Sequence, residues 1–103
     1  MQTYRQGDVL VIRDDKATGG EAIPRDKGRV VLAYGEVTGH AHAIRNPNVC
    51  QLRNEGHTIL RVDGPASALL EHEEHATIEL PPGNYRVVIQ QEYTPEEYRN
   101  VAD

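Results

Sequence analysis

Four of the five histidines lie in two short clusters, and their spacing is the feature of this sequence that could do chemistry. His40 and His42 are two residues apart, whereas His72 and His75 are three residues apart. On a β-strand, side chains two apart project from one face about 6.6–7 Å from each other, so His40 and His42 can direct ring nitrogens at one point. His72 and His75 share a face in a helical turn and point to opposite faces in an extended strand.

Neutral imidazole binds divalent transition metals, and Zn, Fe, Ni and Mn are the candidates here. A metal site open to substrate usually has three protein ligands and a water. His40 and His42, with either His72 or His75, would supply such a set, so all four histidines are predicted metal ligands. Carboxylates that could ligate or orient them are Glu36, Glu71, Glu73 and Glu74. The bound metal would act as a Lewis acid or activate its water.

Two other interpretations of the histidines stay open. Without a metal, His40 or His42 could pair with His72 or His75 as general base and general acid on a phosphodiester, with an arginine stabilising the developing charge. The plain alternative is that the histidines are packed or surface side chains. Only the fold decides whether the two clusters meet, and no catalytic residue is assigned.

The remaining reactive side chains have simple structural interpretations. Glu73 and Glu74 fit a solvated acidic turn, His57 fits the exposed start of a strand, and Cys50 fits a small buried apolar residue. A single cysteine forms no internal disulfide, which favours a cytoplasmic protein. The amino terminus has no apolar signal core, and no stretch approaches the roughly 18 apolar residues of a membrane span.

The composition predicts one folded domain over residues 1–103, since 38% of the residues are hydrophobic and 26% are charged. With five tyrosines but no Phe or Trp, the core must be built from Val, Ile, Leu and Ala, with Tyr at its margin. So thin a core favours a homo-oligomer or docking on a larger protein partner. The net charge of −5 disfavours nucleic acid, although a local basic groove made by the fold stays open.

Short β-branched runs between turn residues predict an all-β domain, either a small barrel or a jelly-roll. The turns at Asn46-Pro47-Asn48 and Asn54-Glu55-Gly56 are expected to join three strands into a meander. Residues 14–27 are expected to form a flexible loop with at most a short strand near Ala22 and Ile23. A capping box at Thr94-Pro95-Glu96-Glu97 predicts a short helix over residues 95–101. Strands are expected at residues 9–13, 29–34, 40–45, 49–53, 58–62, 68–71, 76–80 and 85–92.

Two resemblances extend this interpretation. The run from Gly35 to His42, followed by Leu80-Pro81-Pro82-Gly83-Asn84-Tyr85, is similar to small cupins, in which a Gly-led H-x-H strand precedes a P-x-G turn. The likeness implies a metal site in a β-barrel, and it carries over only to His40 and His42, because no cupin-like Glu follows His42 and no His follows Gly83. The whole chain also resembles small uncharacterised bacterial and phage-type proteins with a T-G-H-x-H run, which implies no activity.

The sequence therefore predicts a small, histidine-clustered β domain that binds a divalent metal and supports hydrolytic or acid–base chemistry. One alternative is a non-catalytic module that self-associates or docks on a larger partner. The other is a metal-independent phosphodiesterase with a histidine pair. Whether the protein is an enzyme is left open.

Overall fold

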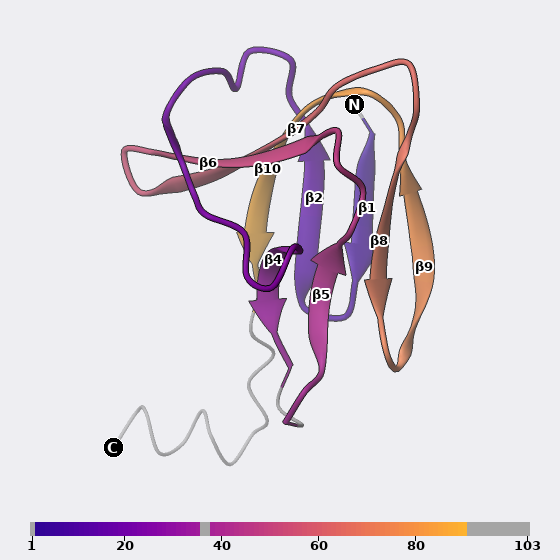
Figure 1. Cartoon of the computed structure of the whole chain (residues 1–103). Helices are drawn as coiled ribbons and strands as arrows, with labels where there is room; N and C mark the ends of the chain where they lie inside the picture. The colour runs from indigo at the N-terminus through magenta and orange to yellow at the C-terminus, as the bar shows by residue number, and fades with distance from the viewer. Residues whose placement is uncertain (1, 36–37, 91–103) are drawn as a thin grey trace, which may run out of the picture.

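The computed structural model describes residues 2–35 and 38–90, which form two antiparallel β-sheets. One sheet has the order β1-β2-β10-β7-β6-β3 and the other has the order β4-β5-β8-β9. Figure 1 shows these strands, with the β6–β7 hairpin projecting to one side and β8 and β9 on the other. The strands are β1 (Thr3–Gln6), β2 (Val9–Arg13), β3 (Glu21–Ala22), β4 (Val30–Tyr34), β5 (Ala41–Ile44), β6 (Val49–Asn54), β7 (His57–Val62), β8 (Ala68–His72), β9 (His75–Leu80) and β10 (Gly83–Ile89).

The all-β class is confirmed, but of the two expected architectures, a small barrel or a jelly-roll, the barrel is wrong because the sheets do not close. Within the described residues, strand pairing stops at β1 and β3 in one sheet and at β4 and β9 in the other. The described residues contain no helix, so none could span a membrane. The helix expected over residues 95–101 lies outside the described part of the chain.

The two sheets share one apolar core. Strand alternation places every second side chain on the inner face, as in β2, where Val9 and Val11 are buried. The core has the predicted Val, Leu, Ile and Ala character, but Tyr85 lies inside it rather than at its margin, with 0% of its surface exposed. Its hydroxyl donates a hydrogen bond to the Pro81 carbonyl, which satisfies the polar end of the ring. The core cluster is Val9, Val11, Val30, Leu32, Ile44, Val49, Leu60, Val62, Ala68, Leu70, Leu80 and Tyr85.

The hairpin predicted at Asn54-Glu55-Gly56 is confirmed between β6 and β7. Asn54 pairs with His57, which leaves Glu55 and Gly56 as the two turn residues. Their φ angles are 50° and 83°, as a type I′ turn requires at both central positions. His57 is the first residue of β7, directly after this turn, and its side chain is exposed.

The predicted meander through Asn46-Pro47-Asn48 is wrong, because this segment crosses from one sheet to the other. β5 pairs with β4 and β8, whereas β6 pairs with β7 and β3. Asparagine side chains hold the crossing: Asn46 Oδ1 accepts the Leu69 N–H at 2.9 Å, and Asn48 Nδ2 donates to the Asp63 carbonyl at 2.7 Å. These bonds, to β8 and to the residue that follows β7, take the place of a hairpin ladder.

The segment over residues 14–27 contains β3, which is the short strand expected near Ala22. β3 pairs with β6, and the Ile23 N–H extends the pairing with a bond to the Gln51 carbonyl of 2.8 Å. Asp14 begins the segment with an ion pair to Arg86 of 3.0 Å. The flexibility of this loop stays a prediction.

Candidate functional site

One end of the two-sheet structure gathers three chain segments around the histidines. The β1–β2 turn, the β8–β9 turn and the start of β5 all reach this end, which is the lower end in Figure 1. His40 directly precedes β5, and His42 is its second residue. Toward the opposite end, the same inner face of β5 continues with the core residue Ile44. The histidines therefore cap the apolar core.

The structure brings both histidine clusters together. The ring centroid of His72 lies 4.3 Å from that of His42, 4.7 Å from that of His75 and 5.8 Å from that of His40. The rings of His42 and His75 stack with 5.8 Å between centroids. Both members of the His40-x-His42 pair contact His72, as expected for side chains on one face of an extended segment.

His72 and His75 meet through a geometry that differs from both expected ones. They are directly opposite partners across a β-hairpin, at the end of β8 and the start of β9. Glu73 and Glu74 are the two turn residues between them. Residues three apart in sequence therefore become cross-strand neighbours, whose side chains lie on the same face of the pair.

His42 is the buried member, with 3% of its surface exposed, and Gln6 fixes its tautomer. The Gln6 amide nitrogen donates to the Leu70 and Ala76 carbonyls, both at 3.0 Å, so its oxygen faces His42. That oxygen lies 2.9 Å from His42 Nδ1 and can only accept, so the Nδ1 atom of His42 carries the proton. The lone pair of the neutral ring is therefore on Nε2.

The His42 lone pair faces a carboxylate. Nε2 of His42 lies 3.6 Å from Oδ1 of Asp8, which is in the β1–β2 turn. At this distance the two atoms form no hydrogen bond. Burial, followed by repulsion from His72, lowers the pKa of His42 below its ordinary value, while Asp8 opposes the shift. The shift favours the neutral ring, which keeps its lone pair.

His72 has the opposite tautomer. Its Nδ1 accepts a hydrogen bond of 3.0 Å from the Glu74 backbone N–H, so the proton of the neutral ring is on Nε2. A metal bound by His72 must therefore displace this bond or move the proton between the ring nitrogens. One ordinary hydrogen bond contributes about 1 kcal/mol, which is small beside a metal–ligand interaction.

Glu73 is held at the mouth of the site. Its Oε1 accepts the Ala41 backbone N–H at 2.9 Å, and this bond is the main cause that lowers the pKa of its carboxyl group. His40 and His72 lower that pKa further by charge. Ligand atoms of His40, His72 and Glu73 all lie within 4.8 Å of one another. Two imidazoles and one carboxylate are a donor set that binds divalent metals.

The predicted residues divide into three groups. His40, His72 and Glu73 form the close triad, while His42 and His75 contact His72 from the side. The other carboxylates have other neighbours or lie outside the triad: Glu71 forms an ion pair with Arg45 at 3.4 Å, Glu74 lies 3.8 Å from His40 Nδ1, and Glu36 lies outside the described residues. Cys50 is half-buried in β6, in the other sheet.

Two glycines allow the backbone to approach the imidazoles closely. A Cβ added to Gly7, whose φ is 60°, would lie 2.9 Å from His75 Nε2 and 3.3 Å from His42 Cε1. A Cβ on Gly35 would lie 2.9 Å from His40 Cβ and 3.3 Å from His72 Nε2. Larger residues at these positions would displace the rings.

Gln6 and Asp8 are the site residues that the sequence interpretation did not identify. The Gly7-Asp8 turn is recognisable from its residue types, but β1, which precedes it, lacks the alternating apolar pattern of a strand. A buried glutamine is visible only once β1 is placed against β8 and β9. The Gly7-Asp8 turn was the one feature of the sequence that pointed to this part of the site.

Comparison with known proteins gives a family but no activity. No curated protein and no solved structure matches the chain. Residues 5–90 match a family described as a domain of unknown function, DUF8820, and this match does not support the resemblance to cupins. The matched region contains all ten strands of the described residues except the start of β1, together with the four clustered histidines. The chain therefore belongs to the DUF8820 family.

Proposed function

We propose that this domain binds one divalent transition metal at the histidine end, with His40, His72 and Glu73 as its ligands. The observation that carries the proposal is the approach of three ligand atoms to within 4.8 Å of one another. Metal bonds of about 2.0–2.2 Å would draw the ligand atoms to about 3.3 Å apart, a closure within reach of side-chain rotation. Zn, Fe, Ni and Mn all accept this donor set.

The surroundings of the triad support an open rather than a purely structural site. Three protein ligands leave coordination positions for water or substrate. The metal would then polarise a bound group or lower the pKa of its water. His42, whose tautomer leaves its Nε2 lone pair unprotonated, lies beside His72 and would supply a base next to the site.

Zinc titration of protein that has been stripped with a chelator tests the proposal. We expect about one zinc per chain by calorimetry and by elemental analysis after dialysis. His72→Ala and Glu73→Gln should each lower the affinity by 10-fold or more, since each removes one of three ligands. His57→Ala and Glu79→Gln are the matched controls, because both residues are exposed and lie outside the triad. No uptake by the wild type, or equal loss in the controls, would contradict the proposal.

Metal-free acid–base catalysis is the second candidate, and the two tautomers favour it. His42 presents a lone pair at Nε2, whereas the neutral His72 ring carries its proton at Nε2. The rings are 4.3 Å apart, so one could remove a proton while the other, when protonated, donates one. Hydrolysis of an activated phosphodiester that persists in excess chelator and is lost in His42→Ala would favour this candidate over the metal.

A further inference from the structure

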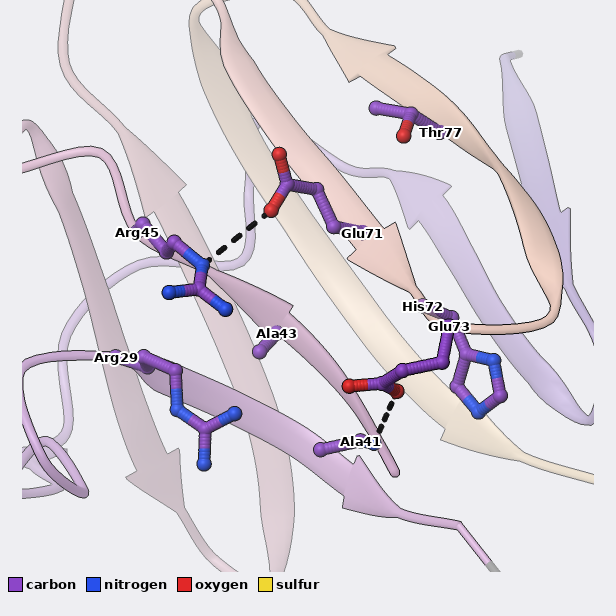
Figure 2. A pocket seen from close by; sticks show the side chains of 8 residues that line it. All are labelled: Arg29, Ala41, Ala43, Arg45, Glu71, His72, Glu73 and Thr77. Carbon is purple, nitrogen blue, oxygen red and sulfur yellow. Dashed lines mark hydrogen bonds and ion pairs between the residues drawn. The ribbon is translucent and has the colours of Figure 1, made fainter. Parts of the chain in front are cut away.

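A second feature adjoins the proposed metal site on the outer face of the four-stranded sheet. This groove of about 300 Å³ is lined by residues of β5, β8 and β9, of the chain just before β4 and just after β5, and of the β8–β9 turn. His72 and Glu73 belong both to the groove and to the proposed ligand set. The lining residues are Arg29, Ala41, Ala43, Arg45, Glu71, His72, Glu73 and Thr77 (Figure 2).

Small side chains on β5 leave room in this groove. Ala41 and Ala43 project to the outer face between longer side chains of the neighbouring strands, and both are nearly fully buried. Figure 2 shows the Arg29 guanidinium on one side of Ala41 and the His72 ring on the other, with the Glu73 carboxylate next to Ala41. A ligand in the groove near Ala41 would therefore have a cation on one side and the proposed metal on the other.

The two arginines of the groove differ in the partners that their side chains have among the described residues. Arg45 forms an ion pair with Glu71, and Glu73 accepts the Ala41 N–H. In contrast, the half-buried Arg29 side chain makes no hydrogen bond or ion pair with any described residue. A guanidinium that is partly removed from water is costly unless an anion pairs with it, and its fork matches the two oxygens of a carboxylate or phosphate.

The charges of the groove make anion binding dependent on the metal. Arg29 and Arg45 are balanced by Glu71 and Glu73, so the groove without a metal has no net charge. A divalent cation bound to Glu73 would make the net charge of the groove positive. The attraction for an anion would then arise only in the loaded protein.

We propose that the groove binds the oxyanion of a small ligand, a phosphate or a carboxylate, through Arg29 and next to the metal. This inference rests on the proposed metal site and names the class of ligand that the site would take. Arg29 would hold one end of the anion while a neighbouring group of the same molecule reaches the metal. The domain would thereby select small anionic molecules.

Titration of the zinc-loaded protein with phenyl phosphate and with benzoate tests this inference, and the two probes separate the two oxyanions. We expect binding of at least one probe, and a loss of 10-fold or more in Arg29→Gln, which corresponds to about 1.4 kcal/mol. Arg53→Gln, an exposed arginine on β6, should leave the affinity unchanged. Removal of zinc should abolish binding in every variant.

Zinc content measured in the same samples separates the two proposals. If the wild type takes up no zinc, the metal site itself is wrong, and the inference falls with it. If zinc is bound but neither probe binds, or if Arg29→Gln binds as tightly as the wild type, the inference alone is overturned. Normal zinc content in Arg29→Gln also shows that the variant has folded.

Discussion

His42 Nδ1 lies 2.9 Å from Gln6 Oε1, and the same Gln6 amide donates to the backbone carbonyls of Leu70 and Ala76. Gln6 belongs to β1 of the six-stranded sheet, whereas its three partners belong to the four-stranded sheet. A single buried side chain therefore ties the two sheets together and sets the protonation of the site. A change at Gln6 should therefore alter both the stability of the fold and the protonation of His42.

Gln6→Met should destabilise the fold by about 2–4 kcal/mol, because it removes the partner of the buried His42 N–H and one partner each of the buried Leu70 carbonyl and the part-buried Ala76 carbonyl. The midpoint of urea denaturation, at an unchanged m-value, measures this loss. Gln90→Met is the control, since Gln90 is exposed and should change stability by less than about 0.5 kcal/mol. An equal effect of both substitutions would show that the Gln6 bonds do not matter.

Gly7→Ala should disturb the histidine site through two effects, the backbone strain of a positive φ and the contact of the new Cβ with His75. Gly7 and Gly28 both have positive φ, 60° and 80°, but only at Gly7 would a Cβ meet other atoms, with His75 Nε2 at 2.9 Å. Gly28→Ala should therefore cost about 1 kcal/mol, from strain alone. Gly7→Ala should cost about 2–3 kcal/mol and should also weaken zinc binding. Zinc affinity of Gly7→Ala equal to that of Gly28→Ala would contradict this expectation.

Zinc should raise the melting temperature of the wild type, because a ligand that binds only the folded state stabilises it. At free zinc 100-fold above the dissociation constant, the gain is about 2.7 kcal/mol, which in a domain of this size is a shift of more than about 10 °C. His40→Ala should remove most of the shift, whereas His57→Ala should keep it. Scanning calorimetry with and without chelator measures both, and a shift preserved in His40→Ala would argue against that ligand.

Tyr85 should make stability fall at high pH. Burial raises the pKa of its hydroxyl, while the Arg13 guanidinium 5.5 Å from the ring centre opposes the shift. The unfolded chain, with an ordinary pKa of about 10, then loses its proton first, so stability is full below pH 10 and declines above it. One such group gives a slope of at most about 1.4 kcal/mol per pH unit.

Denaturation of Tyr85→Phe between pH 8 and 11 checks this sign. The variant should be less stable at pH 8, because the bond to the Pro81 carbonyl is lost, and should have a flatter profile above pH 10. Tyr4→Phe, which changes the partner ring at 6.2 Å, should keep the wild-type decline. Parallel profiles for wild type and Tyr85→Phe would exclude Tyr85 as the cause.

Much of the strand pattern follows from local sequence. The β-branched residues of β2 and β4 alternate, so both strands were predicted almost to the residue, and the Glu55-Gly56 turn follows from side chains that tolerate positive φ. The placement of His40 and His42 on one face follows from the period of a strand. These features depend only on neighbours along the chain.

The remaining features depend on tertiary contacts. The turn at Glu73-Glu74 has no glycine or asparagine to announce a hairpin, so the pairing of His72 with His75 was not predictable. The crossing at Pro47 resembles a hairpin in its residue types and differs only in the distant bonds of its asparagines. The predicted homo-oligomer, the larger partner and the cytoplasmic location stay predictions.

The hairpin turn of β8 and β9 also constrains how this family can vary. Since side chains alternate along a strand, one residue inserted between His72 and His75 would turn one of them to the opposite face. Substitutions at Glu74, which is exposed, would leave the pairing intact. We therefore expect members of the family to have no insertion or deletion in this turn, even where its residue types differ. The number of residues between the two histidines should vary less than the identity of those residues.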